Sequence, residues 1–168
     1  MWGGIYAVLF SISTMLSDEN PIARGFPKSE ADSYMKYTLS SVEFQNKIVG
    51  QEIQYSFYEN RKFGPLQRGR SLSLTDQGGF WLGYGFIRKV ELSNVLNLNF
   101  DFFPGVYLKN GEEDLGGWLM FRSGIELEYS INDDWRMSLG YDHRSSGDLW
   151  DYNPGMETIK ISIIKAII

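Results

Sequence analysis

Apolar and polar residues alternate with a period of two over most of this chain. Between residues 94 and 108 one parity is apolar, whereas the other carries Asn97, Asn99 and Asp101. Residues 117–131 repeat this division, and their polar parity carries charges of both signs. Because successive side chains of a strand point to opposite faces, the pattern predicts strands with one apolar face.

The same alternation predicts eight strands joined by connections of alternating length. The strands are expected at residues 2–14, 33–41, 47–59, 79–88, 94–108, 117–131, 134–145 and 156–167. The connections 15–32, 60–78, 109–116 and 146–155 are long and polar, whereas 42–46, 89–93 and 132–133 are short. Long loops at one end and short turns at the other are typical of outer-membrane barrels. We therefore predict a single all-β domain, residues 1–168, that forms an eight-stranded antiparallel up-and-down transmembrane β-barrel.

A soluble barrel of the lipocalin type is the alternative, in which the apolar parity would face inward around a ligand. The polar parity argues against it, because its charges suit a narrow lumen filled by ion pairs. These charged residues are Asp101, Arg122, Glu126, Glu128, Arg136 and Asp142. We expect them to line the lumen while the apolar face contacts lipid.

Composition removes several classes of function. The net charge of −5 and the scattered basic residues argue against a surface that follows nucleic-acid phosphates. With no Cys and a single His, disulfide frameworks, Cys nucleophiles and multi-His metal sites are excluded. Any catalysis must therefore use hydroxyl groups and carboxylates beside the one imidazole.

No segment of the sequence has the roughly 18 consecutive apolar residues that a membrane-spanning helix requires. Residues 1–16 are fairly apolar, but they lack the basic segment and the small-residue cleavage site of a secretory signal. We assign them to a strand and expect a processed or incomplete N-terminus.

The last two predicted strands carry polar side chains on their apolar face. His143 and Ser145 share the parity of Tyr141, and Glu157 shares that of Ile159. Unpartnered polar groups that face lipid are costly, so these exceptions favour function over packing. In serine hydrolases an imidazole accepts the hydroxyl proton and a carboxylate orients the imidazole. Ser145, His143 and Glu157 are therefore the candidate nucleophile, base and orienting acid.

A tetrahedral intermediate also needs hydrogen-bond donors for its oxyanion. The segment after Ser145 offers the Asn153 amide and the backbone N–H groups around Ser146 and Gly147. Taken alone, a His-x-Ser pair is more often a packing feature than a catalytic one. The remaining motifs of the hairpin therefore decide its interpretation.

The order and spacing of His143-x-Ser145, Asn153-Pro154-Gly155 and Glu157 resemble the signature of the lipid A 3-O-deacylase (PagL-type) outer-membrane family. The resemblance covers the terminal hairpin, and the other strands agree in number and pattern. It implies an eight-stranded barrel with a Ser-His-Glu triad that faces lipid at the outer leaflet. It further implies hydrolysis of the ester-linked 3-hydroxyacyl chain at position 3 of lipid A in lipopolysaccharide, without cofactor or metal. Members of that family can dimerise, although the sequence does not fix an interface.

Two positions depart from the family pattern: Ser146 follows the nucleophile where Asn is common, and the chain ends in Ile168 where barrels commonly end in an aromatic residue. The alternative function is a non-catalytic outer-membrane barrel with a structural or adhesion role that retains the hairpin by descent. Several basic residues could also contact lipid A phosphates, but we interpret them as solvated loop charges: Arg61, Lys62, Arg68, Arg70 and Arg144.

Overall fold

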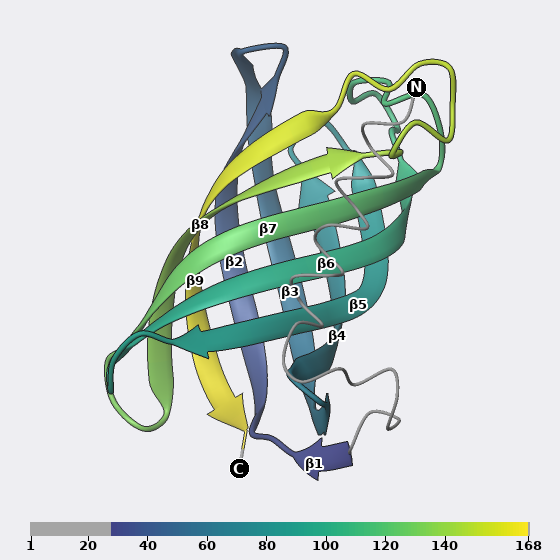
Figure 1. Ribbon diagram of the computed structural model, residues 1–168. Coiled ribbons are helices and arrows are strands. Elements are labelled where there is room, and N and C mark those ends of the chain that lie inside the picture. The colour runs from purple at the N-terminus through teal and green to yellow at the C-terminus, as the bar shows by residue number, and fades with distance from the viewer. Residues whose placement is uncertain (1–27, 168) are drawn as a thin grey trace.

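The computed structural model of the chain describes residues 28–167, which form a closed antiparallel β-barrel (Figure 1). From the second strand onward, consecutive strands pair with one another, pairing of β2 with β9 closes the barrel, and the short strand β1 pairs with β3. The strands are β1 (Lys28–Glu30), β2 (Ser33–Phe44), β3 (Lys47–Phe63), β4 (Leu66–Thr75), β5 (Phe80–Glu91), β6 (Leu96–Leu108), β7 (Leu119–Ser130), β8 (Trp135–Ser145) and β9 (Met156–Ile167). Strands β2–β9 make up the barrel, which confirms the predicted fold class. Within this described range, no helix has the length and hydropathy needed to cross a membrane.

One strand of the barrel was not predicted. The predicted strand 2–14 lies outside the described residues, whereas β4 occupies part of the segment predicted as a loop, 60–78. Patterning missed β4 because Arg68 and Arg70 interrupt the apolar parity of this strand. The predicted number of barrel strands, eight, is thus correct, but the eight strands of the structure include β4, which was predicted as a loop.

Long and short connections lie at opposite ends of the barrel. The loops 109–118 and 146–155 are at one end, here called the loop end, at the top of Figure 1. The turns 64–65, 92–95 and 131–134 are at the other, here called the turn end. The prediction that 42–46 lies opposite the long loops was wrong. The additional strand β4 reverses the direction of β2 and β3, so their turn lies at the loop end.

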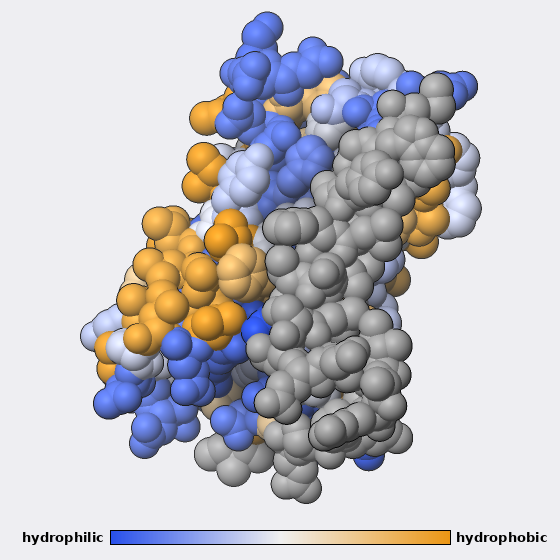
Figure 2. Space-filling view, in the orientation of Figure 1, coloured by the Kyte–Doolittle hydropathy of each residue, from blue (hydrophilic) through white to orange (hydrophobic). Residues whose placement is uncertain are grey.

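The outer wall of the barrel is apolar. Its exposed side chains include Leu39, Leu139 and Ile159, which alternate along their strands with buried polar residues. Figure 2 shows a band of hydrophobic side chains on the visible wall, between hydrophilic ends. This distribution contradicts the soluble barrel and is the one expected of a wall in contact with lipid.

A continuous series of buried ion pairs runs through the lumen. In order, it joins Lys36, Glu126, Lys160, Asp142, Arg122, Glu52 and Arg144, each no more than 2% exposed. The pairs from Lys36 to Glu52 have N···O distances of 2.6 to 3.0 Å. Asp101 lies 3.5 Å from Lys160 and brings the acidic groups to four, equal to the basic ones. The lumen of paired charges that the sequence predicted is confirmed.

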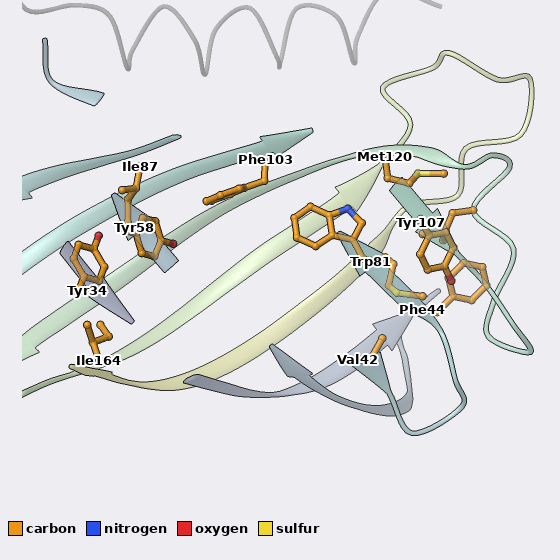
Figure 3. Packing of buried hydrophobic residues seen from close by; sticks show 12 residues of the cluster. Tyr34, Val42, Phe44, Tyr58, Trp81, Ile87, Phe103, Tyr107, Met120 and Ile164 are labelled. Atoms are coloured by element: carbon orange, nitrogen blue, oxygen red, sulfur yellow. The ribbon is translucent and has the colours of Figure 1, made fainter. Parts of the chain in front are cut away.

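Hydrophobic side chains pack in the lumen on both sides of this ionic layer (Figure 3). Toward the turn end, the rings of Tyr34 and Tyr58 stack with centroids 4.4 Å apart. Toward the loop end, Trp81 packs near Met120 and Tyr107, and the loop residue Leu115 is fully buried. The interior is therefore filled by side chains that hold the strands in register.

We expect Leu139→Arg, on the lipid-facing wall of β8, to destabilise the membrane-inserted barrel by about 2–4 kcal/mol. Leu139 is 62% exposed, so the new charge would face hydrocarbon rather than water. The matched control is Leu149→Arg, which changes a 51% exposed leucine in the loop 146–155. Guanidinium unfolding in phospholipid vesicles, followed by tryptophan fluorescence, measures both variants. Equal stability of the two would contradict the assignment of this wall to lipid.

Candidate active site

The antiparallel register places His143 directly opposite Glu157 on the adjacent strands β8 and β9. Both side chains point outward, since Asp142 and Arg144 on either side of His143 are buried in the lumen. Imidazole Nδ1 lies 3.0 Å from Glu157 Oε1, and the two side chains are 41% and 30% exposed. The carboxylate thus fixes the ring orientation and leaves Nε2 as the nitrogen available for proton transfer.

Ser145 is the last residue of β8 and lies on the same face as His143, two residues further along. Its neighbour across the ladder is Phe121 on β7. Among residues 28–167, the Ser145 hydroxyl forms no hydrogen bond with the imidazole. The structure therefore brings His143 and Glu157 into contact and places Ser145 beside them, without a formed Ser–His hydrogen bond. Such bonds are often long or absent before substrate binds.

Gly155 supports the imidazole from the loop that precedes β9. Its φ of +74° is in the left-handed region, and a Cβ at this position would lie 2.6 Å from His143 Cε1. Only glycine satisfies both conditions. Sequence patterning gives Gly155 no individual role, although a glycine after Pro154, two residues before Glu157, is a signal for such close packing.

The loop 146–155 is held by Asn153. Its side-chain Oδ1 accepts a hydrogen bond from the Ser146 N–H at 2.8 Å, and its Nδ2 donates to Asp148 Oδ1 at 2.9 Å. The chain turns at Gly147 and Asp148, which have φ values of 63° and 64°. Of the three predicted oxyanion donors, the Ser146 N–H and the Asn153 amide are thus engaged with the loop itself. The Gly147 N–H forms no hydrogen bond within residues 28–167.

Two further polar residues extend the row that His143 and Glu157 occupy. Ser123 on β7 pairs with His143, and Glu43 on β2 pairs with Glu157. Direct partners in an antiparallel ladder point to the same face, so both face outward beside the site. Sequence patterning misses Glu43 because β2 and β9 are far apart in the chain, and it misses Ser123 because the place of this residue beside His143 depends on the register of the β7–β8 hairpin.

Apolar side chains continue the wall from the site toward the turn end. An open groove includes Ile159, two residues after Glu157 on β9, and its other apolar lining residues include Leu39, Leu139 and Ile161. The arrangement is thus a carboxylate-oriented imidazole and a hydroxyl at the boundary between a polar loop and an apolar wall. It suits proton transfer to or from a substrate whose apolar part lies along the barrel.

The fold is shared with several solved membrane barrels. The crystal structure of the outer membrane enzyme PagL matches with a TM-score of 0.62 and 11% identity, over 80% of this chain and 99% of that chain. A de novo designed transmembrane β-barrel matches with a TM-score of 0.62 and 9% identity, over 83% and 98%. Neisserial surface protein A matches with a TM-score of 0.59 and 8% identity, over 84% and 99%. At these identities the likeness shows the fold alone.

Sequence comparison gives the family. A search of curated protein sequences finds no match. The family model for lipid A 3-O-deacylase (PagL) matches residues 35–164, which is most of the chain and includes β8, the loop 146–155 and Glu157. The matched family and the barrel fold both point to the bacterial outer membrane, and the family points to lipid A as the substrate class. The chain therefore belongs to the lipid A 3-O-deacylase (PagL) family.

Proposed function

We propose that this protein is a serine esterase that hydrolyses the ester-linked 3-hydroxyacyl chain at position 3 of lipid A. Ser145 is the nucleophile, His143 the general base and acid, and Glu157 the residue that orients the imidazole. The observation that carries the proposal is the 3.0 Å contact between His143 and Glu157 on the lipid-facing wall, two residues from Ser145. Family membership supplies the substrate class.

The reaction proceeds through an acyl-enzyme. The Ser145 hydroxyl transfers its proton to His143 Nε2 as its oxygen attacks the ester carbonyl. Collapse of the tetrahedral intermediate breaks the ester bond, and the imidazolium gives its proton to the departing sugar oxygen, which leaves as a free hydroxyl. Water then attacks the acyl-Ser145 ester with the same imidazole as base, which releases the 3-hydroxy fatty acid and restores the serine. Glu157 stabilises the imidazolium in both halves of the reaction.

Of the three predicted donors, we assign stabilisation of the oxyanion to the Gly147 N–H. It follows Ser145 by two residues and is free of hydrogen bonds within the described part of the chain, whereas the Ser146 N–H is bound by Asn153. The role of Asn153 is accordingly to hold the loop turn that presents Gly147. Ser146 contributes its backbone to that turn, and its buried hydroxyl has no hydrogen-bond partner.

The position of the site suits a lipid substrate of the outer leaflet. Ser145 ends β8 at the loop end, beside the long loops 109–118 and 146–155, which are typical of the extracellular side of such barrels. The acyl chain would enter the groove lined by Leu39 and Ile161, and the ester would lie at the membrane interface. The active site therefore faces the outer leaflet, where lipopolysaccharide resides.

Gly155→Ala is expected to lower the deacylation rate about 100-fold, because its Cβ would displace the imidazole. The matched control is Gly78→Ala, which also has a positive φ, +90°, but whose Cβ would contact nothing closer than 3.5 Å. The two variants are compared by their initial rates of fatty-acid release from lipid A, measured on preparations that contain equal amounts of folded barrel. Equal activity of the two variants would show that the close packing against His143 has no catalytic role.

The proposed function is tested by incubating the refolded protein with lipid A in detergent micelles and recording the lipid A mass spectrum. The expected result is loss of one 3-hydroxyacyl mass, with fragmentation that assigns the loss to position 3. Phosphatidylcholine in the same micelles is the control substrate and should remain intact. Unchanged lipid A in the presence of a folded barrel would favour the non-catalytic, structural or adhesive alternative.

A further inference from the structure

The outer wall has a second polar region, at the turn end over β3 and β4. Glu59 shares the parity of exposed Ile53 on β3, and Arg68 and Arg70 share that of exposed Leu72 on β4. All three therefore point outward from the barrel, near the turn 64–65. Both arginines fall in a segment that the sequence pattern predicts as a solvated loop, but they lie on a strand of the wall that faces lipid.

Glu59 holds the two guanidinium groups side by side. Arg68 Nη2 lies 2.8 Å from Glu59 Oε2, and Arg70 Nη2 lies 3.4 Å from Oε1. The side chain of Arg70 is 65% exposed, that of Arg68 27%, and that of Glu59 16%. One carboxylate shared by two arginines leaves one net positive charge, and the more exposed guanidinium keeps N–H donors for another acceptor.

Aromatic rings support these cations from the same wall. Arg68 lies over the Phe63 ring at 4.8 Å, and Arg70 over Phe57 at 5.9 Å. Around the barrel, Lys165 lies 5.0 Å from the Trp135 ring beside the turn 131–134, which is also at the turn end. Basic and aromatic side chains together are typical of the level of the lipid headgroups, to which long cationic side chains extend. A cation facing hydrocarbon would be costly, so the expected neighbour of Arg70 is a lipid phosphate.

We propose that Glu59, Arg68 and Arg70 form a binding site for the phosphate of an anionic glycerophospholipid, in the leaflet opposite to the candidate active site. The guanidinium group matches phosphate geometry with two parallel hydrogen bonds, and Glu59 holds the pair of arginines in place before the lipid binds. The net positive charge selects anionic over zwitterionic headgroups. This site lies at the other end of the barrel from Ser145, so it is independent of the proposed esterase reaction.

The test is native mass spectrometry of the full chain in detergent, with phosphatidylglycerol or phosphatidylcholine of identical acyl chains. The wild type is expected to bind phosphatidylglycerol about tenfold or more tightly than phosphatidylcholine. Arg70→Gln should lose about tenfold or more in affinity for phosphatidylglycerol, because it removes the charge-assisted hydrogen bonds of the guanidinium group. Arg70→Lys keeps the charge but not the paired donors, so its affinity for phosphatidylglycerol should lie between those of the wild type and Arg70→Gln. The matched control, Lys109→Gln, removes an exposed cation at the loop end and should bind like the wild type.

Arg70→Gln is the variant of choice because it leaves the closer Arg68–Glu59 pair intact. Its folding is checked by the mobility shift of the unheated barrel on gels. Three results would overturn the proposal: equal binding of the two lipids by the wild type, unchanged phosphatidylglycerol binding by folded Arg70→Gln, or an equal loss in Lys109→Gln. The last would show that net charge, not this site, retains the lipid.

Discussion

Ser145→Ala is expected to lower the rate of lipid A deacylation by about 10³-fold or more, to a level near the background. Removal of the nucleophile leaves no acyl-enzyme route, and only binding and oxyanion contacts remain to accelerate attack by water. The effect should appear in kcat with little change in KM, because the hydroxyl contributes to the chemical steps rather than to binding of the acyl chains. Release of 3-hydroxy fatty acid from lipid A, measured over a range of concentrations, separates the two parameters.

Ser123→Ala is the matched control for this experiment. Ser123 lies on the same outer wall, directly opposite His143 on β7, so its removal also deletes one hydroxyl beside the imidazole. We expect at most a small change in kcat for this variant. If Ser123→Ala abolishes activity while Ser145→Ala retains it, the nucleophile is on β7 and the assignment of Ser145 is wrong.

Glu52→Ala is expected to destabilise the barrel by about 3–5 kcal/mol, the cost of leaving buried cations without their partner. Glu52 is 1% exposed, accepts a hydrogen bond from Arg122 at 2.7 Å, and also binds Arg144. Ser73 donates a further hydrogen bond to the same carboxylate at 2.8 Å. Since Arg144 lies between His143 and Ser145 on β8, loss of this anchor also loosens the strand that carries the site.

Guanidinium unfolding in phospholipid vesicles measures the stability of Glu52→Ala. Asp114→Ala is the control, because Asp114 forms an exposed ion pair with Lys109 in the loop 109–118, and such pairs contribute little. The unfolding midpoint should fall for Glu52→Ala and stay unchanged for Asp114→Ala. A barrel that tolerates both substitutions equally would show that the luminal ion pairs do not hold β3, β7 and β8 together.

Most of the barrel could be predicted from sequence because each strand has one apolar and one polar parity. The exception, β4, has the same alternation, but its outward parity reads Leu66, Arg68, Arg70, Leu72 and Leu74. Two arginines in a lipid-facing row look like loop residues when neighbouring strands are unknown. The turn 45–46 was consequently assigned to the wrong end of the barrel. Local alternation thus predicts which segments are strands. The direction of a strand in the barrel is predicted correctly only if the strands next to it in the sequence have all been identified.

The candidate site was predictable in part for a similar reason. Shared parity on the two strands of the last hairpin predicted that His143 and Glu157 would meet, and they do, at 3.0 Å. The close packing of Gly155 on the imidazole and the register that places Ser123 beside His143 depend on three-dimensional contacts that no sequence spacing specifies. The use of the Ser146 N–H by Asn153 likewise depends on the path of the loop.

Covalent trapping with a long-chain alkyl fluorophosphonate tests the central claim most directly, because the reagent labels an activated serine. Trypsin cleavage after Arg122, Arg136, Arg144 and Lys160 places Ser123 and Ser145 in different peptides, 123–136 and 145–160. We expect the label on Ser145 in the wild type and none on this residue in His143→Ala. A label on Ser123, or an unlabelled protein that still deacylates lipid A, would contradict the assignment of Ser145 as the nucleophile.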